Sequence, residues 1–371
     1  MPGKELEERA PFDRDKFLLK MGKKSARDVK KLMSAKPPEL KSLDPELKKL
    51  VEERMKTPLS AFDLKYRLFG VGNYGKKYKK EQVGRYKLES QAMFIAGQLH
   101  LKDEPLDALY SYFWPVAQAH LSMPEYKMPG GIGRRSLRVA KLISKAWVHS
   151  HAFDYANLEL KDFKPFYGGH ETRTVWSALG VDILGRAGDV EDIPALDQIS
   201  EKCWEGSMEG DCGAARRKII SRAALKATLD REQLEKVGLK TKLSDVHLID
   251  KLVPLMNVSG LSYVLQAFPG MKGMARLSTN PVEASLEAKE IKKIVQKGVG
   301  REFEFKPGMF AEGEEYAYYG SAQSFAEEHG LIKDTGRKEY RSSRKFFKFT
   351  PKGKKFIKAL FKGLKDIQIK F

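Results

Sequence analysis

The sequence predicts a mainly α-helical protein with several domains. At 371 residues the chain can bury two or three cores, and 42% hydrophobic residues is ordinary for a globular protein. Apolar residues recur at helical spacing through most of the chain, whereas short strands are indicated only near its C-terminal end. We expect four parts: a charged helical arm (1–60), a basic helical domain (61–165), a stack of paired helices (166–279) and a small mixed domain (280–371).

The basic composition predicts an acidic partner. The formal charge is +19 and the pI is near 9.6, which favours nucleic acid, with an anionic membrane surface as the alternative. Cys203 and Cys212 have neither zinc-site nor disulfide-framework spacing, so we expect no metal and no cofactor. The absence of a long apolar run and of a signal-peptide pattern favours a cytoplasmic protein without membrane spans. Four Asn residues beside abundant Lys and Glu match the bias of thermophile proteins.

Two basic segments of the N-terminal half are candidate binding surfaces. Residues 64–88 interleave cations with tyrosines, which is typical of binding to single strands or flexible RNA. The alternative is a basic surface loop whose aromatic rings fill the core. The candidate residues of this segment are Lys76, Lys77, Lys79 and Lys80.

The second candidate surface follows a flexible stretch at 129–133. Four cations fall at i, i+4, i+7 and i+11 along one predicted helix, so they share one stripe: Arg134, Arg138, Lys141 and Lys145. Leu137 and Trp147 can turn inward on the other side. Because no acid is interspersed, the stripe predicts a phosphate-facing helix; the alternative is a solvated face.

The middle of the chain predicts paired helices. Residues 174–228 divide into three helices, with joints at Gly188-Asp189 and near Gly210-Asp211. The run from Leu184 to Asp189, followed by Ile193-Pro194, resembles the helix joint of HEAT-type repeats. This resemblance implies a stack in which each helix pair buries its apolar face on a neighbour.

The C-terminal end carries two short motifs. Gly330-Leu331-Ile332 is followed by a basic run, Lys333 to Lys348, that reads as two strands joined by a hairpin. Thr350-Pro351-Lys352-Gly353 then opens a helix, with Thr350 as its cap and Pro351 in its first turn. That helix has an apolar face and a lysine face.

Further elements are predicted upstream of these two motifs. A helix is predicted from Asn280-Pro281 to Gly298, a strand at 301–305, and a short helix at 321–329. With the two motifs, residues 280–365 resemble the winged-helix family, whose third helix ends in Gly-Leu-Ile and enters the major groove. Here that helix carries Glu327 and Glu328 and no Lys or Arg, so the sequence does not favour base reading through it.

Residues 333–371 hold fourteen Lys or Arg against three Asp or Glu, a net charge of +11. Such unopposed charge favours phosphate contacts; the alternative is a protein-docking module with a solvated lysine edge. The candidate phosphate-binding residues are Arg337, Lys338, Arg341, Arg344, Lys345, Lys352, Lys354 and Lys358.

The sequence therefore predicts a non-enzymatic nucleic-acid-binding protein, with double-stranded DNA favoured over RNA and weak sequence specificity. An RNA- or ribosome-associated protein is one alternative, and a protein partner on the winged-helix or HEAT-like surface is a further possibility. A nucleic-acid enzyme is the other alternative. His170 and Arg173 match the His-x-x-Arg element of tyrosine recombinases, but the nearest suitable tyrosines, at 316–319, lie far along the chain. A DNA glycosylase would use a Trp and an acid, for which Trp176 and Asp182 are one pair.

Overall fold

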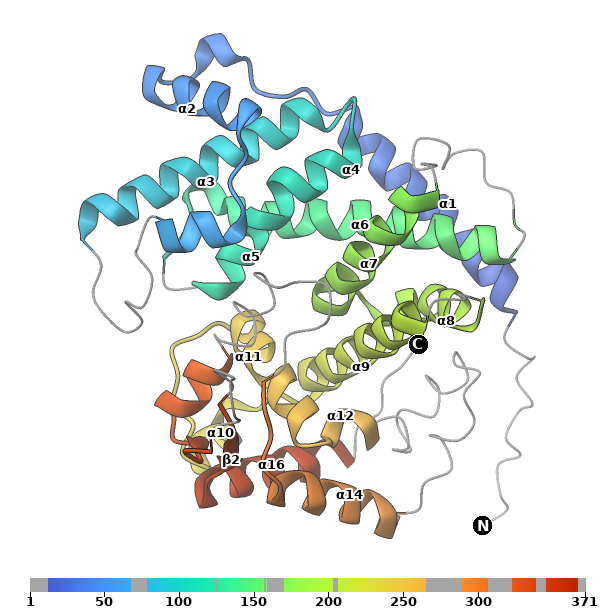
Figure 1. Cartoon of the computed structure of the whole chain (residues 1–371), viewed down its shortest axis with the longest axis vertical. Helices are drawn as coiled ribbons and strands as arrows, with labels where there is room; N and C mark the ends of the chain where they lie inside the picture. The colour runs from blue at the N-terminus through green and yellow to red at the C-terminus, as the bar shows by residue number, and fades with distance from the viewer. Residues whose placement is uncertain are drawn as a thin grey trace, which may run out of the picture.

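The computed structural model describes residues 13–67, 79–123, 126–156, 158, 170–202, 206–264, 288–305, 322–337 and 345–365. Most of these residues are helical, and the sheet among them has two strands of three residues each (Figure 1). The mainly α-helical class predicted from the sequence is confirmed.

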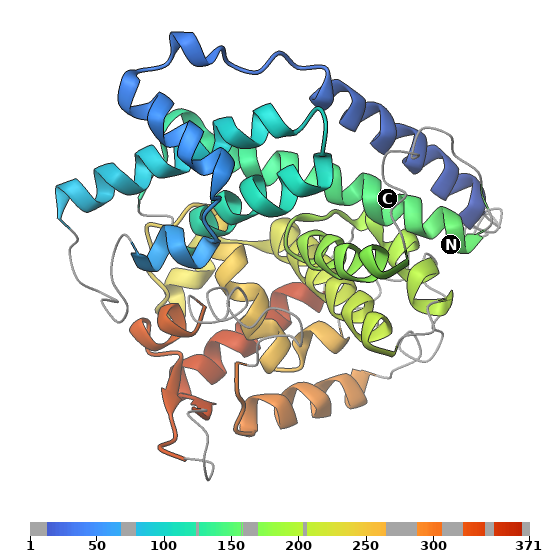
Figure 2. The same ribbon diagram turned by 45° about the horizontal axis from the view of Figure 1, so that its top comes forward.

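The N-terminal half is a layer of helices. Its helices in chain order are α1 (Arg14–Met33), α2 (Pro45–Lys56), α3 (Lys80–His100), α4 (Pro105–Ala108), α5 (Trp114–Ser122) and α6 (Ile132–Ala156). Short 3-10 or π turns lie between them: η1 (Leu40–Ser42), η2 (Asp63–Arg67), η3 (Leu109–Phe113) and η4 (Pro129–Gly131). The central helix is α6, because α1 and α5 both pack along it, and Figure 2 shows α1 lying beside α6.

Local signals explain several of these elements. The side chain of Asp44 accepts a hydrogen bond from the backbone N–H of Glu46 at 2.9 Å, and Pro45 is the first residue of α2. The π turn η3 joins α4 to α5 and places Tyr112 and Phe113 in the core. These rings pack the core rather than line a binding site.

The middle of the chain continues the helical stack. Its elements are α7 (His170–Ala187), η6 (Val190–Asp192), α8 (Ile193–Lys202), α9 (Gly206–Thr228), α10 (Arg231–Lys236), α11 (Asp245–Val258) and α12 (Leu261–Val264). α7 packs between α6 and α9, and α8 packs on both α6 and α9. The side chain of Arg14 fixes α1 to α8 through Glu201 at 2.7 Å. Buried apolar residues from Leu18 to Ile357 form one connected cluster through the described residues.

One predicted helix joint is confirmed and the other is wrong. α7 ends before Gly188-Asp189, as expected. α8 ends at Lys202, and α9 begins at Gly206 and runs straight through Gly210-Asp211. A helical glycine costs only about 1 kcal/mol, which the burial of Ile219 and Ile220 on the same helix outweighs.

Glycines in α7 mark close approaches between helices. A Cβ added at Gly185 would lie 3.0 Å from Cα of Ala215 in α9, and one at Gly180 would lie 3.1 Å from the Trp147 ring in α6. Small residues at these two positions therefore let α7 pack closely against the helices on either side of it.

The C-terminal end forms a small unit around a hairpin. α14 (Ala288–Gly300) is followed by Phe303, whose backbone exchanges hydrogen bonds with Phe347, and residues 322–328 form a short helix. β1 (Ile332–Asp334) pairs antiparallel with β2 (Phe347–Phe349), and α16 (Pro351–Lys365) follows. The predicted hairpin strands and last helix are confirmed. Residues 265–287, 306–321 and 338–344 lie outside the described part, so the predicted helix start at Asn280-Pro281 does too.

Every residue of Thr350-Pro351-Lys352-Gly353 has a structural role. Thr350 Oγ1 accepts from the backbone N–H of Gly353 at 3.0 Å and donates to the carbonyl of Gly330 at 2.6 Å. Pro351 is the first residue of α16, and Lys352 Nζ donates to the carbonyl of His329 at 2.7 Å. This motif therefore joins α16 to the end of helix 322–328.

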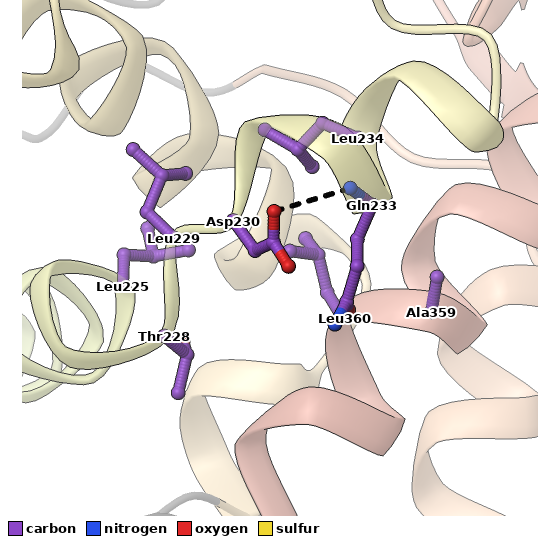
Figure 3. Close-up of a pocket in the computed structure, with 8 residues that line it drawn as sticks. All are labelled: Leu225, Thr228, Leu229, Asp230, Gln233, Leu234, Ala359 and Leu360. Carbon is purple, nitrogen blue, oxygen red and sulfur yellow. Dashed lines mark hydrogen bonds between the residues drawn. The ribbon is translucent and has the colours of Figure 1, made fainter.

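The C-terminal unit packs directly on the helical stack. Figure 3 shows Ala359 and Leu360 of α16 facing Leu225 and Leu229 at the end of α9 and Leu234 of α10. The space left there is about 20 Å³, enough for one water and too small for a ligand. This seam is a packing contact rather than a binding site.

Candidate nucleic-acid interface

The last helix presents an acid-free lysine face. α16 contains no Asp or Glu, and Phe356 and Ile357 are fully buried on its inner side. Its exposed lysines are Lys354, Lys355, Lys358 and Lys362. In the part of the chain that the structure describes, none of these four pairs with a carboxylate. Their charges are free to meet an anion.

The hairpin adds cations to the same unit. Lys333 and Lys348 are cross-strand partners, both exposed, in the register that pairs Ile332 with Phe349. Like charges directly opposite each other destabilise a strand pair unless an opposite charge compensates. A bound phosphate would supply that charge. Lys355, Lys362 and this pair were not among the residues selected from the sequence.

The structure describes only some of the hairpin residues that the sequence predicts to bind phosphate. Lys345 is exposed, and Arg337 is exposed but held by Glu302 at 3.5 Å and by the ring of Phe346 at 4.7 Å. Lys338, Arg341 and Arg344 lie outside the described residues. Lys352 is half-buried, and its ammonium is already bonded to the carbonyl of His329.

The helix at 322–328 has the acidic surface expected from its sequence. Glu327 and Glu328 are both exposed. His329, just after the helix, contacts the carbonyls of Phe325 at 2.9 Å and Lys240 at 3.1 Å, so the end of the helix is tied to the loop before α11. An exposed acidic helix in this position disfavours phosphate beside it.

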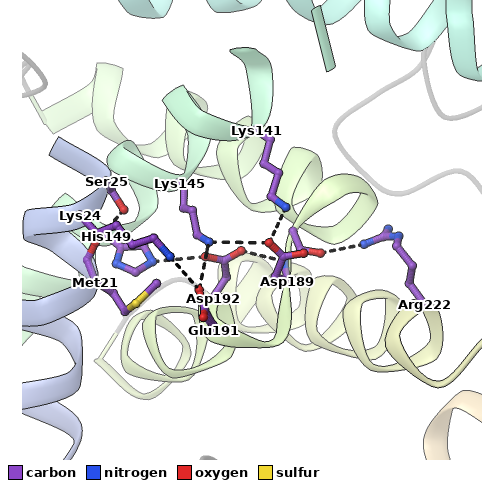
Figure 4. A network of polar contacts seen from close by, with 11 residues as sticks. Met21, Lys24, Ser25, Lys141, Lys145, His149, Asp189, Glu191, Asp192 and Arg222 are labelled. Atoms are coloured by element: carbon purple, nitrogen blue, oxygen red, sulfur yellow. Dashed lines mark hydrogen bonds and ion pairs between the residues drawn. The ribbon is translucent and has the colours of Figure 1, made fainter. Parts of the chain in front are cut away.

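The stripe of cations on α6 divides into two pairs. Arg134 and Arg138 are exposed. Lys141 pairs with Asp189, and Lys145 is buried with its Nζ 3.1 Å from Oδ1 of Asp192 (Figure 4). Asp192 belongs to η6 and Asp189 is its N-cap residue, which is why spacing along α6 alone could not reveal these acids. Only the first two cations remain at the surface.

Asp192 and Lys145 stabilise each other in their charged forms. Burial alone would raise the pKa of Asp192, but the hydrogen bond from His149 and the charge of Lys145 hold it below its usual value. Burial alone would lower the pKa of Lys145, but Asp192 and its acidic neighbours raise it. This network stabilises the junction of α6, η6 and α8.

The remaining N-terminal candidates lie on other elements. Lys79 and Lys80 are exposed at the start of α3, while Lys76 and Lys77 lie outside the described residues. α3 packs on α2 and α6, whereas α16 packs on α9 and β2. The structure therefore does not join these lysines and the C-terminal cations into one site.

Of the four residues considered for an enzyme, the structure describes the side chain of Asp182. Asp182 is paired with Arg186 at 3.1 Å and Lys218 at 3.2 Å. Burial alone would raise the pKa of Asp182, but these two cations lower it, so its carboxylate is already neutralised. The side chains of His170, Arg173 and Trp176 lie outside the described part.

Comparison of the chain with protein-family models, with curated proteins and with solved structures gives no match. Among the described helices none is both long and apolar enough to cross a membrane. The described residues contain no cluster of three or more His, Cys, Asp or Glu side chains placed to hold a metal ion.

Proposed function

We propose that this protein is a non-enzymatic nucleic-acid-binding protein that holds the phosphate backbone of double-stranded DNA with its C-terminal unit. The observation that carries the proposal is the acid-free face of α16, where four exposed lysines lie without carboxylate partners in the described part of the chain. The facing pair Lys333 and Lys348 on the hairpin supports it. The resemblance of residues 280–365 to winged-helix domains supports it independently.

The arrangement favours weak sequence specificity. Lysine is a flexible point charge, and contacts to phosphate position a protein on a duplex without reading bases. The helix that would read bases in a winged-helix domain carries exposed Glu327 and Glu328, which repel phosphate. We therefore expect the hairpin and α16 to carry the contacts. A cytoplasmic location belongs to the same proposal.

Affinity for duplex DNA is expected to fall steeply with salt. If three to six of the exposed C-terminal cations meet phosphates, log K should fall with log salt at a slope of about −3 to −5, since each contact contributes about −0.9. The measurement is fluorescence anisotropy on a labelled duplex at KCl concentrations from about 50 to about 400 mM. This range lies on both sides of physiological salt, where affinity through phosphate contacts changes steeply.

Two comparisons complete that experiment. Duplexes of unrelated sequence should bind about equally, because phosphate contacts carry no base information. Single-stranded DNA and a structured RNA of the same length serve as parallel probes. Tighter binding to the RNA would favour the ribosome-associated alternative, and a flat salt response on every probe would remove the phosphate-backbone proposal.

A further inference from the structure

A pocket of about 700 Å³ lies where the start of α6 meets the start of α11. Its lining includes His120 from α5, Lys127 and Arg134 from the α6 side, and Lys242, Ser244 and His247 from the α11 side. The volume suits a small ligand. This pocket is separate from the seam under α16 and from the exposed face of that helix.

All the charged side chains that line the pocket are positive. Lys127, Arg134 and Lys242 are exposed at its wall, and none of the residues that line it is acidic. Within the described residues none of the three cations pairs with a carboxylate. Asp245, three residues after Lys242, has its carboxylate held by Arg231 at 2.6 Å, and Glu125, two residues before Lys127, lies outside the described residues. Among the described residues, no carboxylate competes with an anion for these cations.

Two helices begin at the pocket. α6 starts at Ile132 and α11 at Asp245, and both exceed twelve residues, at 25 and 14. Ser244 is the N-cap residue of α11, but its side chain makes no capping hydrogen bond. The first backbone N–H groups of α11 therefore lack a side-chain acceptor, and the positive ends of two helix dipoles add to the charge of the cations.

Two histidines in the pocket are short of partners. His247 is 8% exposed, and the rings of His120 and His247 lie 4.9 Å apart at 74°. The Nδ1 atom of each is buried without a hydrogen bond. Burial lowers the pKa of both, that of His247 to about 4, with help from the charges of His120, Lys251 and Arg134. Both imidazoles are neutral at pH 7 and each has one N–H to donate.

The backbone is shaped around this pair. A Cβ at Gly133 would overlap the ring of His120, so the first turn of α6 can lie against that ring only with glycine there. Buried polar groups without partners cost free energy, and native proteins hold few of them. The two Nδ1 atoms are closed off from solvent, so a ligand in the pocket would meet its walls, which the two rings and the three exposed cations form.

We propose that this pocket binds a phosphate monoester, either on a free nucleotide or at the end of a nucleic-acid strand. Three cations and two helix N-termini match a dianion with several acceptor oxygens better than a single carboxylate. Neutral imidazole N–H groups add donors without adding charge. The site does not depend on the proposed duplex-binding surface. That surface lies on α16 and the hairpin, and no residue of either lines the pocket.

Calorimetric titration of the full chain in phosphate-free buffer tests the site, with inorganic phosphate, adenosine 5′-monophosphate, adenosine and succinate as probes. Phosphate and the monophosphate should bind, and adenosine should not. The Arg134→Gln/Lys242→Gln variant should weaken binding of the monophosphate by about tenfold or more, the loss expected from even one charge-assisted hydrogen bond. Both positions are exposed, so this variant should fold normally.

The matched control is Lys20→Gln/Lys23→Gln, which removes the same charge from the exposed face of α1. It should bind the monophosphate as tightly as the unaltered chain. Short oligonucleotides with and without a 5′-phosphate identify the source: a preference for the phosphorylated end assigns strand ends, and binding of the mononucleotide alone assigns free nucleotides. No phosphate binding, equal binding of succinate, or equal loss in the control variant would overturn the proposal, whatever happens to duplex binding at α16.

Discussion

Replacing Asp192 with alanine is expected to lower the free energy of unfolding by about 3–5 kcal/mol, as for other buried ion pairs that lose one partner. The carboxylate is fully buried, with Oδ1 3.1 Å from Nζ of Lys145 and 3.4 Å from Nε2 of His149. Its Oδ2 accepts from the backbone N–H of Asp189 at 2.9 Å. Alanine would leave a buried ammonium and a buried N–H without their main acceptor. Urea unfolding followed by circular dichroism measures the loss.

Two variants separate this effect from simple charge removal. Glu191 is half-exposed and pairs with Lys24 at 3.5 Å, so Glu191→Ala should cost about 1 kcal/mol or less. Lys145→Met combined with Asp192→Asn removes both charges of the pair and should be more stable than Asp192→Ala. An Asp192→Ala protein as stable as Glu191→Ala would contradict the structural role given to this network.

Replacing Gly353 with alanine is expected to destabilise the C-terminal unit by about 1–3 kcal/mol or more, the usual cost of overpacking. A Cβ at this position would overlap the carbonyl oxygen of Leu331 and lie 3.1 Å from the ring of Phe349. α16 would have to move away from Leu331 and β2. Since the proposed phosphate-binding lysines lie on α16 and the hairpin, duplex affinity should fall together with stability.

Gly84→Ala is the matched control for that substitution. Gly84 is exposed within α3, and a Cβ there would meet nothing within 4 Å. Alanine should stabilise this helix by about 0.5–1 kcal/mol and leave DNA binding unchanged. Thermal unfolding and anisotropy on the same preparations test both variants. A Gly353→Ala protein with normal stability would show that α16 does not pack against Leu331 and β2 as described.

The C-terminal unit could be predicted because its signals are local. Thr350, Pro351 and Gly353 act within a single helical turn, and the antiparallel register follows from the hydrogen bond between Thr350 N–H and the carbonyl of Leu331. The alternation Phe347-Lys348-Phe349 also predicts that the Lys348 side chain points outward, because neighbouring side chains of a strand lie on opposite faces. What the sequence lacked was the identity of its cross-strand neighbour, Lys333.

The fate of the α6 cations could not be predicted in this way. Lys141 meets Asp189, 48 residues further along the chain, and Lys145 meets Asp192 in the same turn. A helical stripe without acids of its own says nothing about acids on the elements packed against it. His120 and His247 come together for the same reason, through the packing of distant segments.

The break near Gly210 was misplaced because a glycine is a weak signal inside a long helix. Gly210 is exposed and meets no neighbour that would require its conformational freedom. Gly188, by contrast, follows the end of α7, and a Cβ there would overlap the carbonyl of Leu184. Tertiary packing, which the sequence does not display, decides between the two.

The salt slope of duplex binding, compared between two triple variants, tests the proposed interface most directly. One variant replaces Lys354, Lys358 and Lys362 of α16 with Gln, and the other replaces three exposed lysines of α1 with Gln: Lys20, Lys23 and Lys31. Both remove the same charge, so any general effect of net charge is shared. The α16 variant should flatten the slope by about 2–3 units, one for each lost phosphate contact, and the α1 variant by less than about one unit. Equal slopes in the two variants would contradict a phosphate-binding surface on α16.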